Sequence, residues 1–552
     1  MLSVHFSSRP SIAIANIELL ENIGFEGRGL KDSRIFAQTL TILMNSIANQ
    51  TENASKFYKR KEHDNNSVKK VVEIFIKYFF AINSTNFDDV CSKTFLYLYK
   101  MCEAPDSLSQ QIIMTIFERL QIISEKLNGQ SLTSREEHDE LEPFDVITQA
   151  PVLTAQTQVP SSGKVLLTIP VTLSARFIFL IGHIAMRELI HLDIDVYSNL
   201  RYRQELTDAV KNNNKNKKAK NKRKTMQNDS ANAALKRLSI MPQADQDSDT
   251  DDVVGASAED AFAEQINHIC EQEMLFSKES LLRRFSPMII EVLKFPSKYK
   301  QEELQQAAVL ALIHIMSVSS KFCENNIPFL MNIFQHTKNI KIKCNIIIGL
   351  SDFTFRFPNV IEPWSGQLYS TLHDKDNELR LTTVKILAHL ISHEMILVRG
   401  QISDLAICIV DENLEIKTIT QQFFKEIANK SNILYNALPD IISRLSDPSL
   451  NLVEVNYHII MKYIIGLINK DRQVESLIEK LCFRFRITNQ ERQWRDIAFC
   501  LSLLTYTEKT IKKLMENIRF FKDKVQVEEV YNSFKQIINN TLKLAKIDLK
   551  VS

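Results

Sequence analysis

The stretch NELRLTTVKILAHLI, residues 377–391, has the apolar spacing of an amphipathic helix, and the pattern occurs four times in the second half of the chain. Its apolar residues stand three and four positions apart, as on a helix face that packs against a core. The other copies are NIKIKCNIIIGLSDF (339–353), NLEIKTITQQFFKEI (413–427) and SLNLVEVNYHIIMKY (449–463). The apolar residues that open the four helices follow one another at intervals of 37 residues: Ile342, Leu379, Ile416 and Val453. A period this regular indicates an array of repeated structural units.

Looser copies of the pattern extend the array on both sides, from LQQAAVLALIHIM near Leu304 to WRDIAFCLSLL near Trp494. A shorter apolar segment precedes the long helix in each unit, as in PDIISRLSD, so a unit consists of two helices. Such a pair cannot bury its apolar faces alone and must stack on its neighbours. The sequence therefore predicts an all-α solenoid of helical hairpins, and its period of about 37 residues is typical of HEAT repeats.

A polar turn separates the two helices of each unit and carries Asp374, Asp411 or Asp447. Arg380 follows the first of these and Lys417 the second. We expect the aspartates to cap the second helix of each unit, because their side chains can accept hydrogen bonds from its free amides. The basic residue beyond the turn can then reach an aspartate of a neighbouring unit.

Charge composition divides the chain into three parts. Residues 211–224, KNNNKNKKAKNKRK, hold eight basic residues and no acidic one, whereas 245–252, DQDSDTDD, hold five acidic residues and no basic one. Neither run can bury apolar surface, so 205–258 are predicted to form a disordered insertion. It would separate a degenerate, HEAT-like helical region, 1–204, from the C-terminal solenoid, 259–552.

Composition excludes several other classes of protein. Glycine occurs 11 times in 552 residues, far below the usual share of about 7%, which favours helices with short connections over sheets or phosphate-binding loops. The eight cysteines are scattered without a CxxC pair, as in a reducing compartment. The most apolar window, 165–186, is interrupted by Pro170, Arg176 and His183, so a buried helical hairpin is expected there and no membrane association.

The motifs that usually carry catalysis are absent from the sequence, which has no GxxxxGK[ST], GxSxG or HExxH. His389 and His393 are four residues apart but have no third metal ligand near them. The segment 374–379, DKDNEL, lacks the glycine and the final glutamate of a calcium loop and is interpreted as an inter-helix turn. We predict no enzyme activity, no cofactor and no metal site.

Four segments resemble one family in particular. They are RFIFLIGHIAMRELIHL (176–192), CNIIIGLSDFTFRFPNVIEPW (344–364), YNALPDIISRLSDPS (435–449) and ESLIEKLCFRFRITNQERQWRDIAFCLSLL (475–504). Together they are similar to signature segments of the condensin complex subunit 1 family, the HEAT-repeat regulatory subunit of condensin I. The resemblance runs from about residue 174 to about residue 535 and is interrupted by the charged insertion.

The resemblance implies a non-catalytic subunit in mitotic chromosome condensation and segregation. Its implied partners are the kleisin, the heads of the SMC ATPase heterodimer, a second HEAT-repeat subunit, and DNA or chromatin. The implied location is the nucleus, and chromosomes in mitosis, with a cytoplasmic pool left open. The repeats alone would suit a nuclear transport receptor or adaptor scaffold equally well, and this alternative stays open here.

Two sets of residues are candidates for DNA contact. In MILVRGQISDLA (395–406) the family has a lysine–glycine pair associated with DNA contact, and here Arg399 and Gly400 occupy it. The second set is basic residues that alternate with aromatic ones, which we expect to pack inward while the guanidinium groups bind phosphates. It comprises Arg484, Arg486, Arg492 and Arg495. In both sets the alternative is an exposed charge at a helix end.

The charged insertion offers two further hypotheses. Its basic residues could direct nuclear import or attract DNA, or simply solvate a disordered loop. They are Lys217, Lys218, Lys220, Lys222, Arg223 and Lys224. Ser248 lies among acidic residues and suits a kinase that prefers acidic sequences, so it is a candidate phosphorylation site.

Overall fold

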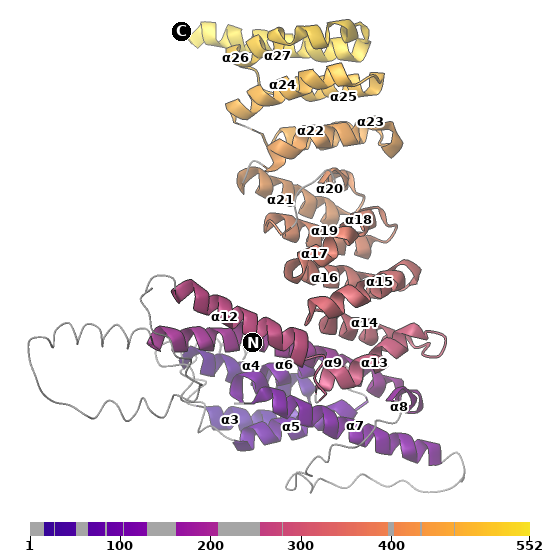
Figure 1. Ribbon diagram of the computed structural model, residues 1–552. Helices are drawn as coiled ribbons and strands as arrows, with labels where there is room; N and C mark the ends of the chain where they lie inside the picture. The colour runs from indigo at the N-terminus through magenta and orange to yellow at the C-terminus, as the bar shows by residue number, and fades with distance from the viewer. Residues whose placement is uncertain are drawn as a thin grey trace, which may run out of the picture. The chain divides into compact units, whose positions relative to one another are not determined.

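All regular structure in the described part of the protein is helical (Figure 1). The computed structural model describes residues 16–26, 28–50, 65–82, 86–102, 104–129, 162–207, 254–278, 280–395, 402–430, 433–468 and 470–551. No strand occurs in these ranges, which confirms the all-α prediction. The chain divides into two compact units, Met1–Pro328 and Phe329–Ser552. These units are defined by contacts within the fold, whereas the three parts expected from the sequence are defined by charge composition. The three-part division stays a prediction.

The first unit is built around a buried central helix, α9. Its longer helices are α4 (Ser33–Gln50), α5 (Asn65–Phe80), α6 (Phe87–Met101), α7 (Pro105–Gly129), α9 (Val171–Ile190), α12 (Val254–His268), α13 (Leu281–Lys294) and α14 (Glu302–Met316). Short helices are α3 (Ile17–Glu21), η1 (Asn22–Glu26), η2 (Arg28–Leu30), α8 (Ser162–Thr168), η4 (His191–Val196) and η5 (Ile269–Glu273). Helix α15 (Ser320–His336) crosses the boundary between the units.

The expected buried hairpin at 165–186 is present as α8 and α9, with Pro170 at the start of α9. A Cβ at Gly182 would lie 2.5 Å from the Cα of Ala311, so glycine lets α9 and α14 approach closely. Arg176 is buried and donates to the carbonyl oxygens of Phe79 and Ala81, at 2.8 and 2.9 Å, which lie at the end of α5. None of the helices in the described ranges is long and apolar enough to cross a bilayer.

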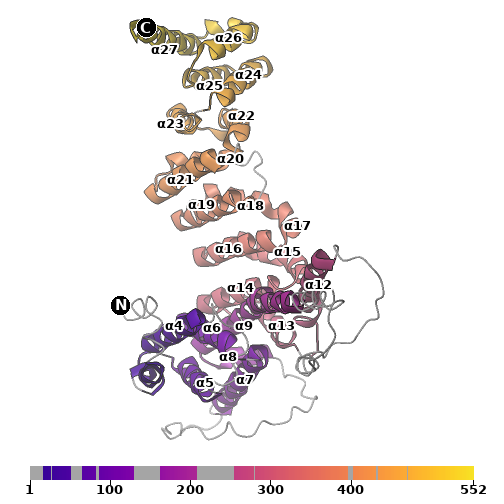
Figure 2. The same cartoon turned by 90° about the vertical axis from the view of Figure 1, so that its left-hand side faces the viewer.

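In the second unit helices stack in successive pairs (Figures 1 and 2). Its helices are α16 (Ile340–Arg356), α17 (Pro358–Ile361), α18 (Ser365–Ser370), α19 (Asn377–Ser392), α20 (Ile402–Ile407), α21 (Leu414–Lys430), α22 (Ile433–Leu445), α23 (Glu454–Ile465), α24 (Asp471–Ile487), α25 (Glu491–Ser502), α26 (Glu508–Glu516) and α27 (Glu528–Val551). Short turns are η6 (Glu362–Trp364), η7 (Thr371–His373), η8 (Cys408–Val410), η9 (Pro448–Leu450), η10 (Ile518–Phe520) and η11 (Lys522–Gln526). Equivalent helices of neighbouring pairs pack together, α16 on α19 on α21 and α20 on α22 on α24, which is the arrangement of an α-solenoid.

The predicted 37-residue register holds for three repeats and fails at the fourth. Ile342, Leu379 and Ile416 are buried, as expected for the first core residue of their helices. Val453 is 61% exposed and precedes α23, whose first fully buried residue is Tyr457. The chain forms η9 at Pro448 before this helix begins, so α23 starts later than the period predicts.

The caps of the second helices differ from the prediction by two residues. Asp376 accepts from the amides of Glu378 and Leu379, at 2.9 and 3.1 Å, and so caps α19. Asn413 caps α21 in the same way, so the expected caps Asp374 and Asp411 were wrong. Asp374 and Asp411 each lie two residues before the cap. Their side chains accept from the amides of the cap residues, Asp376 at 3.0 Å and Asn413 at 2.8 Å. Asp447 caps η9 rather than a long helix.

Of the two basic residues expected to reach a neighbouring repeat, Arg380 forms the ion pair. The Arg380 guanidinium donates to both carboxylate oxygens of Asp411, at 2.9 and 3.0 Å, and both side chains are largely buried. One repeat earlier, Lys343 Nζ lies 3.8 Å from Asp374 Oδ2. Each of these two pairs joins one repeat to the next.

The proline-rich segment after α16 forms a repeat junction. Helix α16 ends at Arg356, Pro358 occupies the first position of α17, and Pro363 lies in η6. Proline is tolerated at these positions because their amides have no partner within the helix. Trp364 is half-buried, and the buried residue of the junction is Ile361.

Candidate partner and nucleic-acid interfaces

The four predicted arginines lie on α24 and α25 and flank the short loop between these helices. Helix α24 is followed by its C-cap residue Thr488, whose hydroxyl donates to the carbonyl oxygen of Arg484 at 2.9 Å. The Trp494 indole donates to the carbonyl oxygen of Thr488 at 2.9 Å and so ties α25 to the loop. The loop is therefore held by side-chain hydrogen bonds on both sides, and the arginines next to it have defined positions.

Three of these arginines bind groups within the protein. Arg484 donates to Asp440 of α22 at 3.0 Å. Arg492 donates to the carbonyl oxygen of Leu452. Arg495 lies 3.4 Å from Glu529 of α27 and 3.9 Å from Glu454. Their positive charge is thus partly compensated, and each guanidinium links two helical pairs.

Arg486 differs from the other three because its side chain is exposed. Its guanidinium carbon lies 5.7 Å from the centre of the Phe483 ring. Phe485 is fully buried as expected, whereas Phe483 is 45% exposed, so the prediction that the aromatic residues pack inward was wrong for Phe483. Among the four, Arg486 has the geometry best suited to an external anion.

A buried carboxyl group explains the position of Arg492. Asp496 is 2% exposed, and burial raises the pKa of its carboxyl to about 6. Arg492 Nε lies 3.7 Å from Asp496 Oδ2, an ion pair that opposes this shift. Tyr457 and Cys500 are buried beside it, with the Tyr457 hydroxyl 3.2 Å from Cys500 Sγ. This cluster is an internal polar contact between α23 and α25.

A groove of about 540 Å³ lies between α22 and α24, next to Arg486. The α24 wall consists of residues that share one helix face: Lys480, Phe483, Arg484 and Ile487. The α22 wall has smaller side chains at the same kind of spacing: Asn436, Pro439 and Ser443. Thr488 closes one end. The sequence prediction included Arg484 but missed the groove, although two apolar residues lie off the buried stripe of α24.

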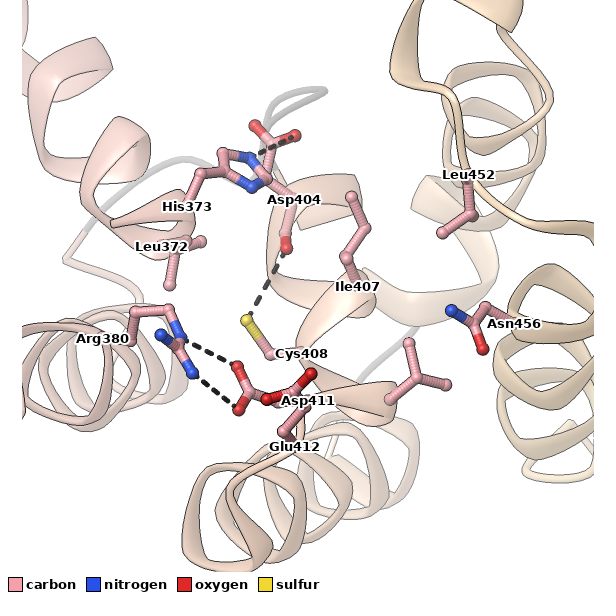
Figure 3. A pocket seen from close by; sticks show the side chains of 11 residues that line it. Leu372, His373, Arg380, Asp404, Ile407, Cys408, Asp411, Glu412, Leu452 and Asn456 are labelled. Atoms are coloured by element: carbon pink, nitrogen blue, oxygen red, sulfur yellow. Dashed lines mark hydrogen bonds and ion pairs between the residues drawn. The ribbon is translucent and has the colours of Figure 1, made fainter. Parts of the chain in front are cut away.

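A second pocket, of about 240 Å³, has contributions from α19, α20 and α23 (Figure 3). Figure 3 shows Arg380 and Asp411 directed toward each other within it. His373 Nε2 lies 3.7 Å from Asp404 Oδ1, and hydrogen bonding to this carboxylate raises the pKa of His373. Because its charged groups are largely satisfied by one another, this pocket is better explained as part of the packing between repeats.

The two histidines that stand four residues apart contact each other at the end of α19. The rings of His389 and His393 lie 4.2 Å apart, and His393 Nδ1 is 2.8 Å from the carbonyl oxygen of His389. No group of three or more His, Cys, Asp or Glu side chains in the described part of the chain is arranged to hold a metal ion.

Several predicted site residues lie outside the described ranges. They are Arg399 and Gly400, the basic residues Lys217, Lys218, Lys220, Lys222, Arg223 and Lys224, and Ser248. The functions expected for them stay predictions.

Known proteins similar to this chain were found by sequence and by structure. A family model described as non-SMC mitotic condensation complex subunit 1 matches residues 341–502. Condensin complex subunit 1 of Xenopus laevis is 37% identical over 382 residues, which cover 69% of this chain and 26% of the relative. The human protein of the same name is 35% identical over 378 residues, which cover 68% of this chain and 26% of the relative.

The chain belongs to the condensin complex subunit 1 family. It spans about a quarter of the length of these curated relatives. Similar solved structures include the S. pombe condensin Cnd3–Cnd2 subcomplex, with a TM-score of 0.37 and 10% identity, covering 88% of this chain and 61% of that chain. Cohesin subunit Scc3 from Z. rouxii has a TM-score of 0.34 and 11% identity, covering 95% of this chain and 58% of that chain.

The segment matched by the condensin family model contains the features described above. Residues 341–502 extend from α16 to the end of α25 and include both pockets. All four arginines of the α24–α25 region also lie in this segment. The family model thus matches the part of the second unit that contains the Arg380–Asp411 pair and the groove.

Proposed function

We propose that this chain acts as a non-catalytic scaffold in condensin, as part of its regulatory HEAT-repeat subunit. It binds the kleisin and the heads of the SMC ATPase heterodimer in a complex that also holds a second HEAT-repeat subunit. The complex binds DNA and acts on chromosomes in the nucleus during mitosis. The observation that carries the proposal is the 37% identity to a condensin complex subunit 1 across 69% of this chain. A solenoid suits the role because stacked repeats offer extended binding surfaces.

Affinity purification of the tagged chain from mitotic cells, followed by mass spectrometry, tests the scaffold function. We expect two SMC ATPases and a kleisin to be recovered together with the chain. Recovery of transport cargo without these proteins would contradict the proposal and favour the transport-receptor alternative.

For DNA contact we propose Arg399, with Gly400 beside it, and Arg486. The family resemblance supports the first pair, and exposure supports Arg486. Charge reversal at either arginine should weaken DNA binding of the purified complex several-fold and lower the dependence of log affinity on log salt by about one unit, because one phosphate contact is lost.

Arg399→Glu and Arg486→Glu are measured by DNA titration at several salt concentrations. Lys512→Glu is the matched control, since it makes the same charge change on α26 at an exposed side chain paired with Glu508. If the control weakens binding as much as the two variants, the effect is one of net charge and the proposed contacts are wrong.

Two proposals concern the charged insertion. The basic residues from Lys217 to Lys224 direct nuclear import, and Ser248 is phosphorylated by a kinase that prefers acidic sequences. Replacing the basic residues with glutamine should reduce the nuclear fraction of the chain in interphase microscopy. Phosphopeptide mapping through the cell cycle should find Ser248 modified, and its absence at every stage would contradict that site.

A further inference from the structure

The groove between α22 and α24 exposes apolar side chains that the solenoid core does not use. Phe483 is 45% exposed and Ile487 is 63% exposed, whereas Leu481, Cys482 and Phe485 of the same helix are fully buried. Exposed large apolar side chains that line a concave surface are a common feature of binding sites.

The shape of the groove results from unequal walls. Lys480, Phe483 and Ile487 project from α24, while the facing wall of α22 offers only Asn436, Pro439 and Ser443. The small side chains on the α22 wall leave open space opposite the long side chains of α24. Lys480 and Ile487 are seven positions apart on α24, so the groove is about 10 Å long. This length admits about two turns of a helix or about three residues of an extended segment.

The charges of the groove have one sign. Lys480 and Arg484 are the only charged residues that line it. Lys480 Nζ lies 4.4 Å from the centre of the Tyr435 ring, and Arg484 is paired with the exposed carboxylate of Asp440. Beyond the lining, the exposed guanidinium of Arg486 adds a further positive charge.

A further arginine lies near Phe483, beside the Phe520 ring. The Phe520 ring meets the Phe483 ring edge to face at 6.1 Å, and Arg519 lies 4.8 Å from the centre of Phe520. Phosphates of a nucleic acid would use the arginines but leave the apolar walls unfilled. A protein segment with both an apolar and an acidic side chain complements both features.

We propose that this groove binds a short acidic segment of a partner protein. A large apolar side chain of that segment inserts between Pro439, Phe483 and Ile487, while its Asp or Glu residues face Lys480 and Arg484. The inference deepens the proposed scaffold function and rests on it, because the segment is expected from a protein of the same complex.

Site-specific photo-cross-linking in cells tests the proposal. A benzophenone amino acid replaces Ile487 in the full chain, and the cross-linked peptide is identified by mass spectrometry. Leu414 on α21 is the control position, because it is 76% exposed and lies outside the groove. We expect one protein segment that carries a large apolar residue next to Asp or Glu to be captured at 487 and not at 414.

The proposal would be overturned by a cross-link to DNA, by a cross-link to a segment without acidic residues, or by no cross-link above the level at 414. A cross-link to another part of this chain would also contradict the proposal, because the groove would then hold a segment of the same chain and not of a partner. The scaffold function is measured separately by recovery of the ATPases and the kleisin, so it can stand when the groove proposal fails, and the reverse.

Binding of the captured segment, as a fluorescent peptide, then measures the contribution of each wall. Ile487→Asp and Lys480→Glu should each weaken the affinity of the full chain about tenfold or more, because one removes apolar contact and the other reverses a complementary charge. Leu414→Asp is the matched control and should leave the affinity unchanged. Equal affinity of the Ile487→Asp variant and the unmodified chain, with unchanged circular dichroism, would exclude the groove.

Discussion

The middle and the last repeats of the second unit use their charged residues differently. In the middle repeats, Arg380 and Asp411 pair in a largely buried contact, and the long helices carry side-chain caps. In the last repeats, Val453 and Gln490 stand at the cap positions of α23 and α25 without a side-chain hydrogen bond. There an apolar groove with basic residues lies open instead. The buried ion pair thus belongs to the regular repeats, and the open groove lies where the regularity ends.

The largest expected effect comes from breaking the contact between the middle repeats. Arg380→Ala removes both hydrogen bonds to Asp411 and leaves a largely buried carboxylate without its partner. We expect the free energy of unfolding of the second unit to fall by about 3–5 kcal/mol. Urea denaturation followed by circular dichroism measures this. Arg380→Lys is the control, and it should recover part of the loss because it restores the charge but not the paired geometry.

The second prediction concerns the buried carboxyl group of the last repeats. Burial raises the pKa of Asp496 from 3.8 to about 6, so folding favours its protonated form. The stability from this group is fully present below about pH 4 and is lost as the pH rises through about 6. Two pKa units correspond to about 2–3 kcal/mol.

Denaturation of the protein and of the Asp496→Asn variant between pH 4.5 and 7.5 tests this. The variant should lack this decline. Its free energy of unfolding should therefore increase relative to that of the unmodified protein as the pH rises. Glu454, Arg492 and Arg495 act on this carboxyl in the unmodified protein and lie at the same site in the variant, so the comparison removes their common contribution. Parallel pH profiles would contradict a raised pKa.

A smaller effect is expected from the helix caps. Asn413→Ala removes the acceptor for the amides of Glu415 and Ile416, at 2.9 and 3.4 Å, at the start of α21. The loss should be about 1 kcal/mol. Val453→Ala at the equivalent position of α23 should change stability little, because no side-chain cap is lost there. If both variants lose the same free energy of unfolding, the middle and last repeats do not differ in the contribution of their helix caps.

The fold could be predicted because its information is local and repeated. Ile342, Leu379 and Ile416 have the same spacing and the same burial, since each is the third residue of a capped helix. The prediction failed at Val453, because Leu450 stands where a polar cap would be expected and Pro448 begins a separate turn. Apolar spacing alone does not reveal where a helix starts.

The interface was harder to predict because it depends on which way neighbouring side chains point. Phe483 and Phe485 are two residues apart, about 200° around a helix, so they cannot both face the core. The buried stripe of α24 includes Phe485, which leaves Phe483 at the surface. The contact of Arg492 with the Leu452 carbonyl oxygen joins residues 40 positions apart. Such contacts follow from the stacking of repeats and have no local sequence signal.

The smallest effect is expected for Arg484, the residue common to the predicted DNA set and the groove. Arg484 is paired with Asp440, whose carboxylate is exposed to solvent. Arg484→Ala should therefore lower the free energy of unfolding by about 0.5 kcal/mol or less. Asp440→Ala should have a similar effect, and the double variant measures the coupling between the two side chains. A loss at Arg484 as large as that at Arg380 would mean that the last repeats are joined by the same kind of contact as the middle ones. The open groove would then be a gap within the packing rather than a surface available to a partner.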